Sequence, residues 1–235
     1  MYTRIVTSAL FAGAATGLIA SLLQLSFVQP VLLHAELYES GELVHFGAQA
    51  SGAVSAHQDV GGIDPLRDGL SIVFTMLIYA GYGLIMVAAM ALAEQRGARI
   101  NARNGMIWGI CGFVVAHLAP GFTLAPEVPG VAAADVHARQ AWWFATVAAA
   151  AVGVWLIAFG RSWLAWGIAA LLLVAPHVVG APQPDAFTGP VPTEIGALFA
   201  ARAFGVGLVA WLLLGLMAGH FWQREGQAQG ATQPA

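Results

Sequence analysis

The sequence predicts an all-α membrane protein, a polytopic bundle of six spanning helices with both termini in the cytoplasm. Hydrophobic residues make up 59% of the 235 residues and charged residues only 9%. Soluble domains carry about 25% charged residues. The apolar residues also form six stretches close to the roughly 20 residues that cross a bilayer as a helix. A surface this apolar suits lipid, where apolar side chains need no burial against protein.

The six predicted helices follow in order along the chain. The first covers residues 5–28 and ends before Pro30, and it is too long for the roughly 7–15-residue core of a signal peptide. The third is the shortest, so a count of five spans is the alternative. The later helices cover residues 69–93, 105–119, 141–160, 163–180 and 194–222. We expect one membrane domain over residues 1–222 and a disordered, polar, cytoplasmic tail over residues 223–235.

The arginines predict the orientation, because cytoplasmic loops carry an excess of positive charge. With six spans and a cytoplasmic N-terminus, only Arg67 and Arg139 fall outside, and Arg202 falls within the sixth span. The remaining six arginines fall inside: Arg4, Arg96, Arg99, Arg103, Arg161 and Arg224. Ten of the twelve acidic residues lie at or beyond the outer helix ends. This alternation supports the count of six.

Small residues recur at four-residue spacing and predict close helix packing. The first helix carries Ala9, Gly13, Gly17 and Ser21 on one face, and the pairs Gly105/Gly109 and Gly215/Gly219 repeat the spacing.

Several function classes are excluded. A net charge of -3 gives no reason to expect nucleic acid, and the single cysteine, Cys111, excludes an internal disulfide and a cysteine-based metal cage. The sequence has no nucleotide-binding loop, nucleophile elbow or metalloprotease motif. The absence of these motifs excludes an ATPase subunit as the identity of this chain, and we expect no enzyme and no bound cofactor.

Histidines and carboxylates gather on the predicted outer side, which favours a divalent cation as ligand. Imidazole binds zinc, copper, nickel and similar ions, and carboxylates attract cations. Six of the seven histidines fall in the outer half: His34, His45, His57, His117, His137 and His177. Within the first outer loop, Glu36 and Glu39 follow His34 and suggest a cation-concentrating vestibule, with a solvated acidic loop as the alternative.

Two histidines lie beside helix-ending prolines. His117 precedes Pro120 in a helix of about 15 residues, some 22 Å long, which is shorter than the roughly 30 Å hydrocarbon core. A recessed end would place His117 below the outer surface. His177 follows Pro176, where a broken helix end is the kind of place at which transporters expose ligands. The alternatives are a histidine bonded to a neighbouring helix and an ordinary helix terminus.

Arg202 lies eight residues after Glu194, at a depth of about 12 Å in the sixth helix. An arginine at that depth needs a partner or water. It can pair with an acid, order a carbonyl-rich helix end, or repel cations. Gln24 and Tyr79 are interior polar groups that could reach it. We expect four further polar groups along an ion path: Arg202, Glu194, Gln24 and Tyr79.

Five segments carry a family resemblance over most of the chain. They are Gln29-Pro30-Val31 through Ala35-Glu36-Leu37-Tyr38-Glu39; Asp68-Gly69-Leu70; His117-Leu118-Ala119-Pro120 with Pro126-Glu127-Val128-Pro129-Gly130; Arg139-Gln140-Ala141-Trp142-Trp143; and Pro176-His177-Val178-Val179-Gly180-Ala181-Pro182-Gln183-Pro184. On these segments the chain resembles the CbtA-type proteins, proposed cobalt transporter subunits of the bacterial inner membrane. The resemblance implies Co²⁺ as the transported ion and a small, single-span, histidine-rich CbtB-type partner.

Three functions compete at this point. The first is uptake of Co²⁺ or a similar divalent ion at an outward-facing site drawn from His117, His177, Glu36, Glu39, Glu127 and His34. The second is a membrane-embedded redox protein that holds haem or a metal between histidines. The third is a non-catalytic scaffold for another membrane subunit, which predicts that the histidines are replaceable and the glycine faces are not.

Overall fold

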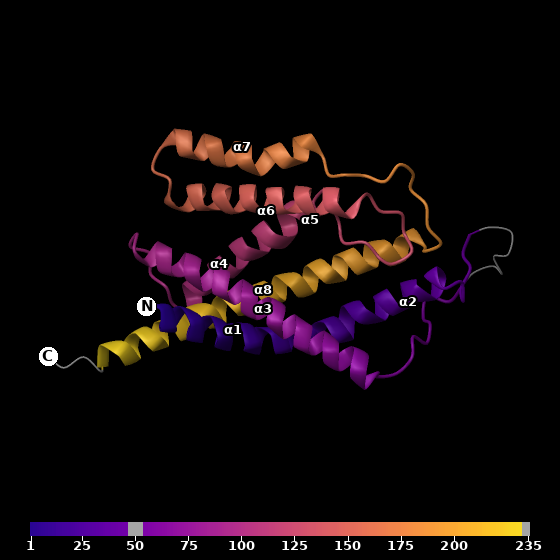
Figure 1. The fold of residues 1–235 in the computed structure, drawn as a ribbon, viewed down its shortest axis with the longest axis horizontal. Helices are drawn as coiled ribbons and strands as arrows, with labels where there is room; N and C mark the ends of the chain where they lie inside the picture. Colours follow the sequence, from indigo (N-terminus) through magenta and orange to yellow (C-terminus); the bar gives the residue numbers. More distant parts are fainter. Residues whose placement is uncertain (47–53, 232–235) are drawn as a thin grey trace. The chain divides into compact units, whose positions relative to one another are not determined.

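The computed structural model describes residues 1–46 and 54–231. Over these residues the chain is helical without any strand, which confirms the all-α class (Figure 1). The elements in order are α1 (Tyr2–Leu23), the π-helical turn η1 (Gln24–Val28), α2 (Gln29–Glu39), α3 (Pro65–Glu94), α4 (Ala102–Phe113), the π-helical turn η2 (Val114–Leu118), α5 (Ala119–Gly121), α6 (Val136–Phe159), α7 (Trp163–Val179) and α8 (Thr193–Ala231). Elements α1, η1 and α2 run on without a break, as do α4, η2 and α5, so each predicted span corresponds to one continuous helix.

Four helices in the described part of the chain are long and apolar enough to cross a membrane. They are Tyr2–Glu39, Pro65–Glu94, Val136–Phe159 and Thr193–Gln227, and α7 is apolar but shorter, at 17 residues. These helices are those of a multi-pass membrane protein. The count of six spans and the cytoplasmic position of both termini stay predictions.

The prediction that Pro30 ends the first helix is wrong, because the helix continues to Glu39. Proline removes one backbone donor and its ring crowds the preceding turn. Here the turn before the proline widens into a π-turn, η1, and the helix resumes. Pro120 is accommodated in the same way after η2. Both π-turns end two residues before their proline; the first helix then continues past Pro30 to Glu39, whereas the third ends at Gly121, one residue after Pro120.

The bounds of two other helices also differ from the predicted ones. The third helix runs over residues 102–121 rather than 105–119, so its length of about 30 Å matches the hydrocarbon core. Helix α8 continues to Ala231, past the expected end at Trp222, so the first part of the expected tail is helical. Residues 232–235 of that tail lie outside the described residues, and the division into one membrane domain and a tail stays a prediction.

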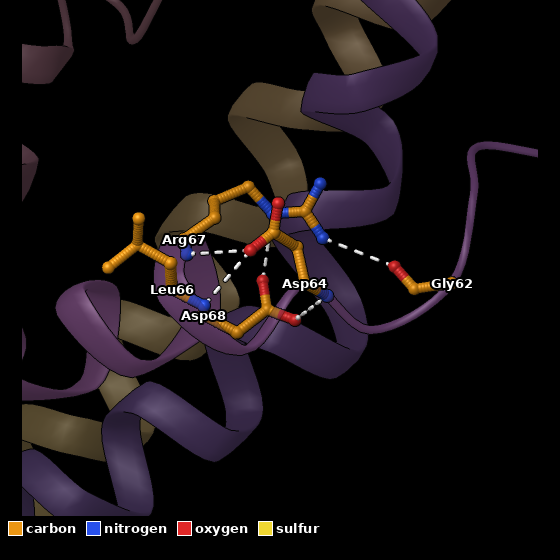
Figure 2. Close-up of polar contacts among 5 residues, drawn as sticks. All are labelled: Gly62, Asp64, Leu66, Arg67 and Asp68. Atoms are coloured by element: carbon orange, nitrogen blue, oxygen red, sulfur yellow. Dashed lines mark hydrogen bonds and ion pairs between the residues drawn. The ribbon is translucent and has the colours of Figure 1, made fainter.

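Polar side chains begin three of the helices. Asp64 caps α3, where its Oδ1 accepts hydrogen bonds from the backbone N–H groups of Leu66 and Arg67, both at 3.0 Å (Figure 2). Asp68 closes the turn from the other side, because its Oδ2 accepts from the N–H of Asp64 at 3.1 Å. Asp135 and Ser162 cap α6 and α7 in the same manner. These caps satisfy backbone donors that have no partner within a helix.

The chain divides into two compact units, each with its own packing. The first comprises Met1–Ser26, Gly62–Phe113 and Gly205–Ala235. In it α1 and α3 pack antiparallel along the predicted small-residue face: Gly13 lies against Ala80, and a Cβ atom on Gly83 would lie 2.8 Å from the carbonyl oxygen of Ala9. Helices α4 and α8 approach as closely, with Gly105 against Gly215. The predicted glycine packing is confirmed.

One end of this first unit is held together by Arg4. Its guanidinium donates two hydrogen bonds, of 3.0 and 2.7 Å, to the carbonyl oxygen of Trp222 and stacks 3.7 Å from the centroid of that indole. Glu94 lies 3.6 Å from the guanidinium and accepts from the indole N–H at 3.1 Å. The start of α1, the end of α3 and the late part of α8 therefore meet.

The second unit comprises Phe27–Gly61 and Val114–Phe204. Its helices α6 and α7 form an antiparallel hairpin, seen side by side in Figure 1, with Gly153 of α6 against Leu173 of α7. Elements η2 and α5 pack on α6. This unit contains all six residues that the sequence proposed as metal ligands.

Candidate functional site

A small hydrophobic cluster ties together the helix ends around the candidate site in the second unit. Tyr38, 3% exposed, packs with Ala35, Val128 and Val191. Around them lie Leu43, Val54, Val131, Ile195 and Phe199. The cluster joins the last turns of α2, the connection before α6 and the beginning of α8. It therefore fixes the loops of this end, and with them the nearby polar side chains.

His177 lies in the last turn of α7, one residue after Pro176. Helix α7 ends at Val179, and the next residue, Gly180, has a φ of 85° that suits only glycine well. Its Nδ1 is 3.2 Å from the hydroxyl oxygen of Thr123. The rings of Phe122 and Trp142 lie edge-on, with centroids 5.3 and 6.3 Å from the imidazole. With Nδ1–H donating to the hydroxyl, Nε2 carries the lone pair that a metal ion requires.

Glu127 is engaged in an ion pair. Its Oε2 lies 2.7 Å from a terminal guanidinium nitrogen of Arg139, on the first turns of α6, and both side chains are about one-third exposed. The Nε of Arg139 and the indole Nε1 of Trp142, one turn further along α6, are buried without a hydrogen-bond partner. The charge of Glu127 is therefore already balanced by Arg139, whereas the Arg139 Nε and Trp142 Nε1 donors have no hydrogen-bond partner.

His34 and the two glutamates of the first outer loop lie on α2. The Nε2 of His34 is buried without a hydrogen-bond partner, and its ring is 5.6 Å from that of Tyr38. Glu36 and Glu39 are exposed, and the side chain of Glu39 lies against Gly130. The glutamates therefore face solvent near the site without being bound into it.

His117 lies in η2 and is half-buried, with a contact to a neighbouring residue. Its helix ends at Gly121, within the expected Pro120-Gly121 pair, but it is longer than expected because it also begins earlier, at Ala102; that His117 lies recessed below the outer surface stays a prediction. Its place in a π-turn is nonetheless notable, since such turns occur often at functional sites.

The proposed ligands are therefore brought to one unit but not to one point. Among residues 1–46 and 54–231, no group of three or more His, Cys, Asp or Glu side chains is placed to hold a metal ion. The imidazole of His177 is oriented by a hydrogen-bond partner, and Glu127 is held by Arg139.

The four further polar groups have separate partners. Arg202 donates from a terminal guanidinium nitrogen to the backbone carbonyl of Phe27, at 2.9 Å. Gln24 accepts from the hydroxyl of Thr75 at 3.2 Å, and Glu194 lies exposed beside the hydroxyl of Thr193. Tyr79 is buried against the ring of Tyr82. Arg202 thus bonds to a carbonyl inside a continuous helix rather than at a helix end, and its three expected roles stay predictions.

A family model described as a probable cobalt transporter subunit, CbtA, matches residues 2–223. The chain belongs to the CbtA family. As a member it is a transporter subunit and not an enzyme, its substrate is a metal ion, and its apolar helices are those of a multi-pass membrane protein. No curated protein and no solved structure matches the chain.

Within this CbtA chain, sequence reasoning missed two residues of the site. Thr123 orients His177, and Trp142 faces the same imidazole with its own N–H unsatisfied. No sequence signal marks Thr123, because only the approach of the connection after α5 to the end of α7 gives its hydroxyl a role.

Proposed function

We propose that this CbtA-family chain is the membrane subunit of a Co²⁺ uptake system and that it captures the ion at the outer end of the second unit. His177 is the first ligand, and Glu127, Glu36, Glu39, His34 and His117 supply or attract the rest. The transported Co²⁺ is the substrate, and no resident cofactor is needed. The protein acts in the bacterial inner membrane with a small, single-span, histidine-rich CbtB-type partner.

One observation carries the proposal: the Nδ1 of His177 lies within hydrogen-bond distance of the Thr123 hydroxyl, in the last turn of a helix that contains Pro176. Histidines that bind metal ions almost always donate their other ring N–H to an oxygen, which fixes the tautomer and the ring orientation. Imidazole also suits cobalt and its neighbours in the transition series. These features support a metal ligand better than a packing role, in which neither ring nitrogen needs to be presented.

Capture then requires a second ligand to approach His177. Glu127 is suited to this, because it is four residues from Thr123 along the same connection. Arg139 neutralises the carboxylate while no cation is present, and an arriving cation competes for it.

The test is initial cobalt uptake by cells that express His177→Ala in place of the native chain. We expect a large loss of uptake, with the variant present in the membrane at the native level. His137→Ala is the matched control, because His137 lies on the same predicted side, on α6, and is exposed. Native uptake by a well-expressed His177→Ala variant contradicts the capture site, and repeating both assays with and without the CbtB-type partner tests the partner.

A further inference from the structure

We propose that the first unit binds the headgroup of a zwitterionic phospholipid, phosphatidylethanolamine, in a cavity where the start of α1, the end of α3 and the later part of α8 meet. The cavity has a volume of about 270 Å³ and is lined by Met1, Arg4, Ala91, Glu94, Gln95 and Trp222. All six residues belong to the first unit, whereas every proposed metal ligand belongs to the second. The inference therefore goes beyond the proposed function and does not depend on it.

Two charged side chains of opposite sign line this cavity, and neither uses its full hydrogen-bonding capacity. The Nε and Nη2 of Arg4 both donate to the carbonyl oxygen of Trp222. Its Nη1 lies 3.6 Å from a carboxylate oxygen of Glu94, which makes an ion pair but is too long for a hydrogen bond. Glu94 accepts one hydrogen bond, from the indole of Trp222, although a carboxylate offers about four acceptor positions. Among residues 1–46 and 54–231, the Nη1 donors and most of the carboxylate thus have no hydrogen-bond partner and are available to a ligand.

The arginine is held in place, while the glutamate stays accessible. The guanidinium lies 3.7 Å from the centroid of the Trp222 indole, a side chain that is only 2% exposed. Gly226 leaves room for the guanidinium, because a Cβ atom on this glycine would lie 2.6 Å from Nη2. The Arg4 side chain is 17% exposed and that of Glu94 42% exposed. The cavity therefore presents a fixed cation beside a carboxylate that a ligand can reach.

These two charges favour a ligand that carries both signs. A simple anion is attracted by Arg4 and repelled by Glu94, and a simple cation meets the reverse. A phosphate linked by a few bonds to an ammonium group satisfies both side chains, because its oxygens accept from the guanidinium while the ammonium donates to the carboxylate. A primary ammonium has N–H groups for the unused acceptor positions of Glu94, whereas a quaternary ammonium has none. Phosphoethanolamine combines these two groups.

The place of the cavity in the fold indicates a lipid rather than a soluble zwitterion. Three candidate membrane spans have an end near it: Tyr2–Glu39, Pro65–Glu94 and Thr193–Gln227. The ends of spanning helices lie at the level of the lipid headgroups, outside the hydrocarbon core. Val6 and Leu92, neighbours of the lining residues on α1 and α3, are 45% and 50% exposed and offer apolar surface to acyl chains. The volume is also below the roughly 300–1,000 Å³ of pockets that enclose a drug-sized molecule, so it suits a headgroup whose chains remain outside.

A purely structural ion pair explains this arrangement less well. The pair of Arg139 and Glu127 in the second unit closes to 2.7 Å. Arg4 and Glu94 are instead 3.6 Å apart, with a cavity beside them. An inserted headgroup would supply the hydrogen bonds that this pair does not make with itself.

The test measures the binding of single lipids to the full chain by native mass spectrometry. Phosphatidylethanolamine, phosphatidylcholine and phosphatidylglycerol with identical acyl chains are compared. Phosphatidylcholine has the same charges as phosphatidylethanolamine, but methyl groups replace the N–H groups of its ammonium. We expect phosphatidylethanolamine to bind about 5- to 10-fold more tightly than phosphatidylcholine, between the effects of an exposed ion pair and of a buried charged hydrogen bond. Equal affinities for these two lipids overturn the proposal.

A change of lipid preference separates a ligand site from a structural cluster. Glu94→Gln keeps an acceptor for the indole of Trp222 and removes the negative charge. It should abolish the preference for phosphatidylethanolamine and make the anionic phosphatidylglycerol the tightest ligand, because no charge then opposes Arg4. The matched control is Glu225→Gln, which removes a negative charge from α8 outside the cavity lining and should keep the native order of the three lipids.

A merely structural role predicts that Glu94→Gln changes the affinity for all three lipids alike. The native order in Glu94→Gln, or the same switch in Glu225→Gln, therefore counts against the site. Soluble glycerophosphoethanolamine, which has the headgroup without acyl chains, should not displace the lipid at equal concentration, and displacement contradicts a lipid as the occupant. If Glu94→Gln does not accumulate in the membrane, the comparison of phosphatidylethanolamine with phosphatidylcholine on the native chain decides. None of these measurements involves cobalt, so their failure is distinct from failure of the capture site.

Discussion

The hydrogen bond between Thr123 and His177 gives the sharpest quantitative expectation for the proposed capture site. Thr123→Val keeps the shape of the side chain and removes the hydroxyl. Loss of such a supporting bond typically lowers metal affinity by about 10- to 100-fold. The bond here is 3.2 Å long and only part-buried, so water can replace the hydroxyl in part. We therefore expect the lower end, about tenfold, which corresponds to about 1.4 kcal/mol.

The assay is initial cobalt uptake over a range of external concentrations. For Thr123→Val we expect a half-saturating concentration raised by about tenfold with the maximal rate retained, because binding is weakened while the path is unchanged. Thr123→Ser, which keeps the hydroxyl, should stay within about twofold of the native chain. An unchanged half-saturating concentration in Thr123→Val, or an equal rise in both variants, would refute the argument that the hydroxyl orients a ligand.

Two other expectations concern stability. Gly83→Val places a side chain against the carbonyl of Ala9 and should lower the free energy of unfolding by about 1–3 kcal/mol, measured as a lower melting temperature in detergent. Gly81→Val is the control, because its position has open space and its melting temperature should not fall. Equal melting temperatures for the two variants would contradict close packing of α1 and α3. Asp64→Ala removes the acceptor of two backbone N–H groups and should lower the free energy of unfolding by about 1 kcal/mol. Asp64→Asn should lower it less, because asparagine also caps helices. An equal fall in melting temperature for both variants would count against the cap.

The Glu127–Arg139 pair has a consequence for ion entry. A carboxylate that already has a cationic partner attracts distant cations less strongly than an unpaired carboxylate, since the two charges nearly cancel beyond a few ångströms. The exposed Glu36 and Glu39 have no such partner among the described ion pairs and are better placed to concentrate cations near the site. For the proposed site we therefore assign the attraction of cations to Glu36 and Glu39 and the ligation of the metal ion to Glu127, although the sequence analysis treated all three as one set of ligands.

Family, fold class and helix positions were predictable from the sequence for a simple reason. In a membrane, each helix must satisfy its own backbone groups, so a long apolar stretch forms a helix largely irrespective of its neighbours. The glycine faces followed equally from spacing, because contact along a helix repeats every three to four residues. Local rules failed at Pro30, where the choice between ending a helix and widening it into η1 is not fixed by the residues nearby.

The site was only half predictable from sequence. Composition predicted that histidines and carboxylates gather on one side of the membrane, and neighbouring prolines singled out both His117 and His177. Only the tertiary structure decided that Thr123 supports His177, that Arg139 takes up Glu127, and that Arg202 bonds to a backbone carbonyl. Those pairings join residues up to 175 positions apart. Hydropathy and periodicity describe which face of a segment contacts lipid, water or protein. Which side chain bonds to which depends on how segments distant in sequence approach one another, and the packing of helices and loops within each unit decided that.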